Sequence, residues 1–299
     1  MRLMLTGANG QVGWELRRSL MPIGEVIAKD RSGCDLSRPR DLPRIIRELN
    51  PDIIVNAAAY TAVDRAEQEG QLATVVNGTA VGVLADEARK SGALVIHYST
   101  DYVFDGTKAS PYTEDDPPNP INAYGRSKLA GGRAVGEAAG NHLILRTCWV
   151  YAARGQNFLR TVLRLARQRD ELRIVADQVG APTWAREIAN ATAHIVQRAC
   201  GERERGGFTS GVFNVTAAGA TNWHGFAEAI LDQAMSRGLL RNRPKVHPIS
   251  SLEYPLPATR PKNSRLAGDR LHERFGIALA DWKQALALCM QEETLMDAS

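Results

Sequence analysis

The strongest constraint on the fold is a regular alternation of short apolar runs and helix-like stretches over the first half of the chain. Each run is three to six residues long and is built around aliphatic side chains. Such runs, separated by helices, are typical of a parallel sheet that helices cover on both faces. The sequence therefore predicts an α/β fold with a doubly wound parallel sheet. The expected strands are 3–5, 25–28, 52–56, 93–98 and 142–146, and the expected helices are 11–20, 41–49, 71–91 and 124–139.

The second half of the chain has a looser pattern. We expect residues 1–148 to form the first domain and residues 149–299 to form mainly a smaller C-terminal lobe, with segments near 180–228 returning to the first domain. The expected elements are helices 158–169, 186–199 and 223–238, strands 172–175 and 211–215, a surface loop at 201–207 and an extended five-proline loop at 244–261. Strand 211–215 is a candidate to rejoin the main sheet.

Length, charge and cysteine usage narrow the class of protein. The 299 residues carry a net charge of +4, from 37 Lys and Arg against 33 Asp and Glu, too little to indicate nucleic acid or a membrane surface as a partner. The apolar runs fall far below the ~20 residues of a membrane-spanning helix. Arg2 leads directly into the first strand, so no signal peptide is expected. The four cysteines are scattered without metal-ligand spacing, which favours a reducing cytoplasm.

A glycine-rich segment, TGANGQVG at 6–13, joins the first strand to the first helix. Gly7 permits a tight turn, Gly10 lets the backbone approach a pyrophosphate, and Gly13 lets the helix pack on the sheet. The helix N-terminus adds amide donors and a positive dipole for the phosphates. The spacing is GxxGxxG, and its place between strand and helix indicates a Rossmann dinucleotide-binding domain. The candidate pyrophosphate-binding residues are Gly7, Gly10, Gln11, Val12 and Gly13.

Asp30 ends the second expected strand, where a carboxylate would bind the adenine-ribose hydroxyls; the alternative is a solvated acid at a strand end. Arg31 follows and could accept a 2′-phosphate, so NADH and NADPH both stay candidates. Further candidate cofactor contacts are Asp35 and Leu36 at the adenine edge and Ala59, Tyr60 and Thr61 in a stretch of small residues.

Tyr124 and Lys128 stand four residues apart at the start of an expected helix, which places a phenol and an ammonium on one face. A nearby ammonium stabilises a phenolate, and the same lysine can bind the nicotinamide ribose. Thr100 and Asp101 end the fourth strand, at the sheet edge where ligands bind. YxxxK alone is a common surface pattern. Its place at the start of a helix, together with Thr100 at the end of the fourth strand, predicts reduction of a carbonyl group.

These segments together resemble the extended short-chain dehydrogenase/reductases, and within them the members that reduce dTDP-linked 4-keto-6-deoxy sugars. The resemblance extends over nearly the whole chain, and its later motifs are more specific than the glycine loop. The motifs that carry it are GQVGWEL (10–16), NAAAYTAVDRAE (56–67), HYSTDYVFDG (97–106), YGRSK (124–128), LRTCWVYA (145–152), DQVGAPT (177–183) and RPKNSRL (260–266).

The resemblance implies roles for particular residues. Tyr124 would donate a proton to the 4-keto oxygen, Lys128 would bind NADPH or NADH and tune Tyr124, and Thr100 with Asp101 would polarise the carbonyl. Trp149 would pack on the apolar side of the sugar, or would be a core tryptophan. Arginine forks suit the diphosphate of the sugar nucleotide, and Arg260 and Arg265, in a Pro-rich loop with Asn263, are the candidates; the alternative is a solvated basic loop. The candidate substrate contacts are Thr100, Asp101, Trp149, Asn157, Gln178, Arg260, Asn263 and Arg265.

One departure from the family concerns a metal. Some members bridge a homodimer through a metal held by acidic side chains, one near Glu15 and one on the helix after GAPT. Here that helix carries Arg186 beside Glu187, which puts a cation in the acidic place. A dimer linked by Mg²⁺ is therefore disfavoured, with Glu15 and Glu187 as the residual candidate ligands, and a homodimer stays open.

Two alternatives stay open at the level of sequence. One is another nucleotide-sugar reductase or an epimerase; a dehydratase is disfavoured because Asp101 is followed by Tyr102 and not by a glutamate. The other is a noncatalytic dinucleotide-binding regulatory subunit, which would not need Tyr124, Lys128 and Thr100 together. Turnover of NAD(P)H with the dTDP-linked keto sugar discriminates between them.

Overall fold

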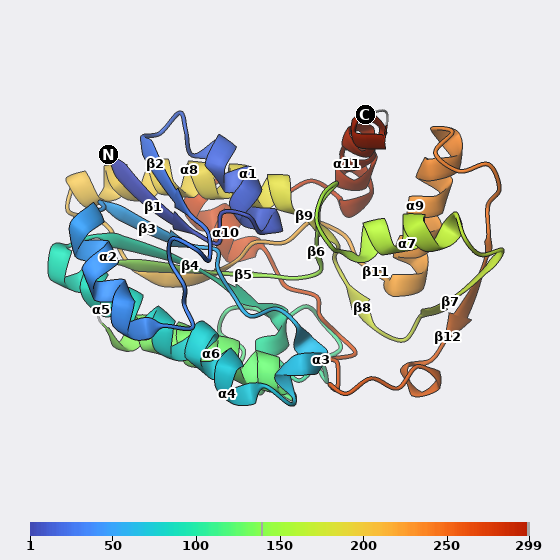
Figure 1. Ribbon diagram of the computed structural model, residues 1–299, viewed down its shortest axis with the longest axis horizontal. Helices are drawn as coiled ribbons and strands as arrows, with labels where there is room; N and C mark the ends of the chain where they lie inside the picture. The colour runs from blue at the N-terminus through green and yellow to red at the C-terminus, as the bar shows by residue number, and fades with distance from the viewer. Residues whose placement is uncertain (139, 298–299) are drawn as a thin grey trace.

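A computed structural model describes residues 1–138 and 140–297, with side chains to residue 292, and centres on a six-stranded parallel sheet (Figure 1). Its strand order is β2-β1-β3-β4-β5-β10, and every neighbouring pair is parallel. The expected doubly wound sheet is confirmed, and strand 211–215 does rejoin it as β10. The strands are β1 (Arg2–Thr6), β2 (Glu25–Lys29), β3 (Ile53–Asn56), β4 (Leu94–Thr100), β5 (His142–Thr147) and β10 (Gly211–Asn214).

Helices cover both faces of the sheet because successive strand side chains point to opposite faces. Leu3 and Leu5 belong to one apolar cluster, together with α1 (Gln11–Ser19), α8 (Ala185–Glu204) and α10 (Asp269–Phe275). Met4 belongs to the opposite cluster, with α2 (Leu42–Leu49), α5 (Ala80–Ser91) and α6 (Ala123–Glu137). Figure 1 shows these two helical layers on either side of the strands.

A separate apolar cluster lies beyond the sheet, at the right of Figure 1. Phe226 and Leu286 are buried at its centre. The proposed division into two lobes near residue 148 rests on this separate cluster. Its elements are α7 (Phe158–Ala166), α9 (Trp223–Ser236), α11 (Trp282–Asp297) and the parallel pair β7 (Glu171–Val175) and β12 (Lys245–Ile249).

Three expectations need correction. The expected helix 71–91 is interrupted: α4 (Gly70–Thr74) passes through a π-helical turn at Val75–Thr79 into α5. The expected loop 201–207 is helical in its first half, because α8 continues to Glu204 and buries Ala199 in the core. The five-proline loop contains β12, which pairs on one side only and therefore tolerates Pro248, a residue without an amide donor.

Other parts of the chain had no expected element. Short segments β6 (Val150–Tyr151), β8 (Val179–Gly180), β9 (Thr183–Trp184) and β11 (Thr221–Asn222), and helices α3 (Val63–Ala66), α10 and α11, add to the two lobes. Residue 139, the end of the expected helix 124–139, and residues 298 and 299 of the proposed second lobe lie outside the described residues.

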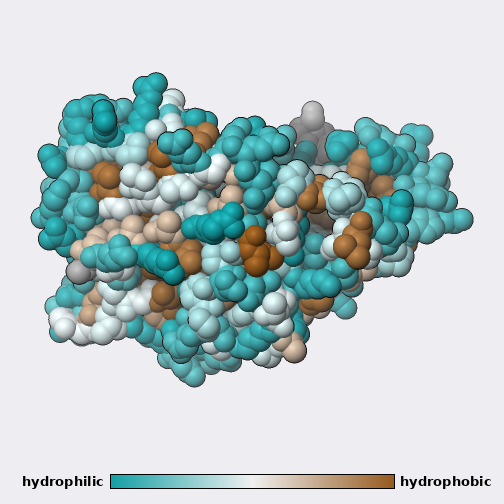
Figure 2. All heavy atoms as spheres, turned by 90° about the horizontal axis from the view of Figure 1, so that it is seen from below, coloured by the Kyte–Doolittle hydropathy of each residue, from teal (hydrophilic) through white to brown (hydrophobic). Residues whose placement is uncertain are grey.

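No described helix combines the length and the apolar character that crossing a bilayer needs. On the face in Figure 2, apolar side chains form small separate groups within a hydrophilic surface. Groups of this size are ordinary for a protein surface.

Candidate active site

A cavity of about 770 Å³ opens at the carboxyl ends of the central strands. β1 lies between β2 and β3 in the sheet. The connection that follows β1 and the connection that follows β3 therefore run to opposite sides, and a crevice opens between them. All but Gly13 of the expected cofactor-binding residues line this cavity. They are Gly7, Gly10, Gln11, Val12, Asp30, Arg31, Asp35, Leu36, Ala59, Tyr60, Thr61, Tyr124 and Lys128.

The glycine loop leaves space where side chains would collide with backbone. Gly7 has φ of +70°, and a Cβ there would lie 2.6 Å from the amide nitrogen of Ala58. A Cβ on Gly13 would lie 2.1 Å from the carbonyl oxygen of Gly7, so Gly13 acts by packing the loop and not by lining the cavity. Gly10 caps α1 without a side chain, which leaves the amides of the first turn to phosphate oxygens.

At the end of β2, Asp30 is held by its own turn. Its Oδ1 accepts from the amide and hydroxyl of Ser32, at 3.0 and 2.6 Å, and its Oδ2 accepts from Asn9 at 2.9 Å. These hydrogen bonds, with that from Ser32 foremost, lower the pKa of Asp30 and keep it ionised. Arg31 is 80% exposed and lies 3.5 Å from Asp35. Asn9 and Ser32 also line the cavity and had no role in the sequence interpretation.

Tyr124, Lys128, Thr100 and Asp101 come together where β4 ends and α6 begins. Asn122 caps α6 by accepting from the amide of Gly125 at 2.8 Å. Lys128 donates to the carbonyl oxygen of Tyr98 at 2.6 Å. Thr100 donates to Asp101 Oδ1 at 2.9 Å and is within hydrogen-bonding reach of Tyr124.

Burial controls the protonation of these groups. It raises the pKa of Tyr124 well above the ordinary value, and the Asp101 carboxylate adds to this. Burial also lowers the pKa of Lys128 to about 7 and raises that of Asp101 to about 6. We expected Lys128 to lower the pKa of Tyr124. The pKa is raised instead, because burial and the Asp101 carboxylate both disfavour the phenolate. Tyr124 is therefore a protonated phenol at neutral pH.

Asn77, inside the π-helical turn, is a site residue that the sequence interpretation missed. Its amide donates to the Tyr60 carbonyl at 3.0 Å and to Ser127 Oγ at 2.9 Å, and its Oδ1 accepts from the Tyr60 amide at 2.8 Å. Ser127 in turn donates to the carbonyl of Tyr124 at 2.7 Å. Asn77 thus ties the cofactor-facing loop to α6. The available signal in the sequence was an asparagine within an otherwise apolar helix-like stretch, and the structure buries it fully.

Two of the expected substrate residues meet through a tryptophan that the sequence interpretation missed. Trp149, at φ +46°, stacks on Trp223 with ring centroids 3.6 Å apart. Trp223 Nε1 donates to Gln178 Oε1 at 3.1 Å, and Gln178 donates to Ser251 at 2.9 Å. These contacts bring together four separate segments of residues 149–299 into one aromatic and amide surface. Asn157 instead caps α7 and donates to Gln11 at 2.9 Å, beside the glycine loop.

The three residues that were expected to bind the diphosphate do not line the cavity of about 770 Å³, and their side chains form hydrogen bonds within the protein. Arg260 forms a two-pronged pair with Asp64, at 3.0 and 2.7 Å, and reaches Tyr102, whose ring packs edge-on against Tyr124. Asn263 donates to two backbone carbonyls at 2.7 and 2.9 Å and accepts from Arg265. Arg260 is therefore separated from Tyr124 by the ring of Tyr102, whereas Asn263 and Arg265 hold loops together.

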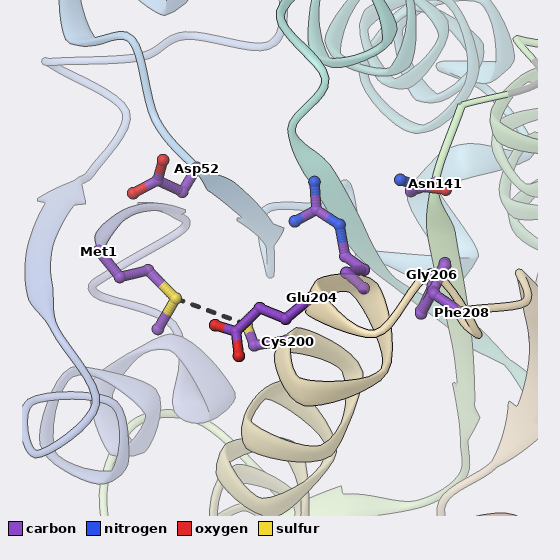
Figure 3. Close-up of a pocket in the computed structure, with 8 residues that line it drawn as sticks. Met1, Asp52, Asn141, Cys200, Glu204, Gly206 and Phe208 are labelled. Carbon is purple, nitrogen blue, oxygen red and sulfur yellow. Dashed lines mark hydrogen bonds between the residues drawn. The ribbon is translucent and has the colours of Figure 1, made fainter.

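A second cavity, of about 610 Å³, lies at the opposite end of the sheet (Figure 3). Met1, Asp52 and Asn141, which precede β1, β3 and β5, line it with Cys200 and Glu204 of α8. Figure 3 shows these side chains around an open hollow. Doubly wound sheets bind ligands at the carboxyl ends of the strands, so we do not assign the active site here.

Fold and site together define a Rossmann-fold oxidoreductase that uses a nicotinamide cofactor. The family model described as RmlD substrate binding domain matches residues 1–295. The chain belongs to this family.

Similar proteins agree over the whole length. The chain is 56% identical over 296 residues to a dTDP-4-dehydrorhamnose reductase of Burkholderia thailandensis, which covers 98% of this chain and 99% of that protein. A solved dTDP-4-dehydrorhamnose reductase of Clostridium acetobutylicum superposes with a TM-score of 0.89 at 35% identity, covering 98% of this chain and 100% of that one. That of Bacillus anthracis, solved in complex with NADP, has a TM-score of 0.86 at 33% identity, covering 97% and 99%.

We expect Gly13→Ala to weaken NADPH binding by about tenfold or more, since the added methyl collides with the Gly7 carbonyl and must displace the loop. Gly136→Ala is the matched control, because a Cβ there meets nothing within 4 Å. The measurement is the dissociation constant of NADPH by fluorescence. Wild-type affinity in Gly13→Ala would contradict the packing role.

Proposed function

We propose that this protein reduces the 4-keto group of dTDP-4-dehydrorhamnose with NADPH or NADH to form dTDP-L-rhamnose. The observation that carries the proposal is that Tyr124 and Lys128 line the crevice that the glycine loop enters, with Thr100 buried behind them at the end of β4. Relatives of 56% and 43% identity over nearly the full chain bear the name of this reaction. The noncatalytic alternative leaves that cluster without a purpose.

The residues of the crevice fit a dinucleotide. The amides at the start of α1 would hold the pyrophosphate, Asp30 or Arg31 the adenine ribose, and Lys128 the nicotinamide ribose. When bound, the reduced cofactor supplies the hydride. The glycine loop packs closely on the backbone of Ala58. Because Gly7 has no side chain, the cofactor can extend across the ends of β1 and β3 there.

Tyr124 is the proton donor in this proposal. Its raised pKa keeps the phenol protonated until negative charge develops on the 4-keto oxygen. In the structure the Thr100 hydroxyl donates to the Asp101 carboxylate. When Asp101 is protonated, it can donate to Thr100, and the Thr100 hydroxyl is then free to donate to the substrate. The pKa of Asp101, about 6, makes that exchange accessible near neutral pH.

The sugar nucleotide would extend from Tyr124 toward the second lobe. The stacked pair of Trp149 and Trp223 offers an apolar face to the 6-deoxy sugar, and Gln178, whose amide bonds Trp223 and Ser251, would hold that face in place. Arg260 would reach the diphosphate only by giving up part of its pairing with Asp64. Asn157, Asn263 and Arg265 stay weaker candidates because their side chains already serve loops and caps.

We also propose the cytoplasm as the place of action and no nucleic acid or membrane as partner. The buried thiols of Cys34 and Cys148 are free, which suits a reducing compartment. A homodimer stays a proposal.

Tyr124→Phe is expected to lower kcat by about 10² to 10⁴ while leaving NADPH affinity nearly unchanged, because it removes a general acid and keeps the ring. Tyr254→Phe, at an exposed tyrosine, is the control. Steady-state kinetics with the dTDP-linked keto sugar provide the measurement. An unchanged kcat would exclude Tyr124 as the acid.

Asp30→Ala should weaken NADH more than NADPH, since the carboxylate would bind the ribose hydroxyls and repel a 2′-phosphate. Asp86→Ala, at an exposed acid in α5, is the control. Dissociation constants for both cofactors, measured side by side, test this. Equal losses would show that Asp30 is not at the ribose.

The kcat/KM for reduction should fall as pH rises above about 7, since Lys128 loses its charge there in the free enzyme while Tyr124 stays protonated. Below that pH the ammonium is charged and its contribution is complete. In Lys128→Arg the part of the fall centred near pH 7 should disappear, because a guanidinium stays protonated throughout, while the part that comes from deprotonation of Asp101 near pH 6 should remain. If the same fall persists in Lys128→Arg, another group is responsible for it.

A further inference from the structure

Three helices meet at a small charged corner outside the active-site cavity. Arg186, in the first turn of α8, donates from Nε to Glu15 Oε2 of α1 at 3.0 Å. The same guanidinium also pairs with Glu292 of α11 through its second arm. Glu15 is only 5% exposed, and Arg186 and Glu292 are partly covered. One cation therefore bridges two carboxylates that lie 277 positions apart in the sequence.

The position of Arg186 within its helix is unfavourable by itself. A cation in the first turn of a helix faces the positive end of the helix dipole. The two carboxylates compensate for this, and Arg186 in turn neutralises Glu15, which would otherwise be a buried uncompensated charge. The three side chains depend on one another.

Some relatives in this family are expected to hold a metal between acidic groups here, and the donor set of this chain does not fit one. Glu15 Oε2 already accepts from the guanidinium, which would repel a divalent cation. Trp14, next in the chain, is surrounded by further cations: Arg154 Cζ lies 3.1 Å and Arg18 Cζ 4.3 Å from its ring centroid. Among the described residues, no group of three or more His, Cys, Asp or Glu could hold a metal.

We propose that Arg186 is a built-in cation that takes the place of a divalent metal and locks α1, α8 and α11 together. α1 and α8 belong to the core of the sheet, whereas α11 belongs to the core of the second lobe. The Arg186 bridge thus joins the two apolar clusters. It follows that the stability and the self-association of this protein do not depend on a divalent metal.

The test compares the full-length protein with three variants in EDTA and in excess Mg²⁺, by thermal unfolding and by light scattering on a size-exclusion column. Arg186→Gln removes the charge and keeps hydrogen-bonding groups. Arg186→Glu gathers three carboxylates. Arg198→Gln is the matched control, at an exposed arginine of α8 that makes no ion pair among the described residues.

The wild-type midpoint and molar mass should be the same in EDTA and in Mg²⁺. Arg186→Gln should lower the midpoint by about 4 °C in both solutions, while Arg198→Gln should not change it. Arg186→Glu should unfold at the lowest temperature in EDTA and regain part of the loss in Mg²⁺. A wild-type midpoint that falls in EDTA and recovers in Mg²⁺, or a dimer that dissociates in EDTA, would overturn the proposal. An Arg186→Gln midpoint equal to that of the wild type would also overturn it, even if Arg186→Glu does not fold.

Discussion

The position of β1 in the sheet is the constraint on which the site depends. Because β2 and β3 flank β1 on opposite sides, the loops that follow β1 and β3 leave the sheet in different directions. The crevice between them receives the glycine loop from one side and the stretch after β3 from the other. The contact distances at Gly7 and Gly13 show how tightly backbone meets backbone there. A side chain at either position would collide with this backbone and displace the loop that a dinucleotide needs.

Burial is the second physical theme, and it sets the chemistry of the site. Lys128 and Asp101 are buried and Tyr124 is partly covered at the cavity wall, so each favours its neutral form. This favours a protonated phenol and a carboxyl group that can exchange a proton with Thr100. A site arranged in this way is suited to giving a proton to a carbonyl oxygen. Charged phosphates of a bound cofactor would in turn favour the ammonium form of Lys128.

Much of the fold was predictable because the core strands are continuous in sequence and strongly apolar. The five expected strands all occur, and the glycine loop, Asp30 and YxxxK all face one cavity. The features that escaped prediction are pairings between distant residues. Trp149 stacks on Trp223, and Arg260 pairs with Asp64, 196 positions earlier. None of these partners has a local signal, since nothing in a short window specifies which distant side chains meet.

The two expected loops that the structure corrects, at 244–261 and 201–207, were also decided by contacts between distant residues. Pro248 marked its segment as a loop, but β12 needs a partner on one side only, and β7 supplies it. Gly201 suggested a loop, yet packing of α8 on the sheet carried the helix past it. Tertiary contacts decided both cases against the local preference.

The most direct test of the central claim is the rate of NADPH oxidation when dTDP-4-dehydrorhamnose is added to the purified protein, with the product identified by chromatography. The account predicts rapid oxidation, formation of dTDP-L-rhamnose in equal amount to the NADPH consumed, and loss of both in Tyr124→Phe. Tight cofactor binding without any turnover of this substrate by the wild-type protein would contradict it.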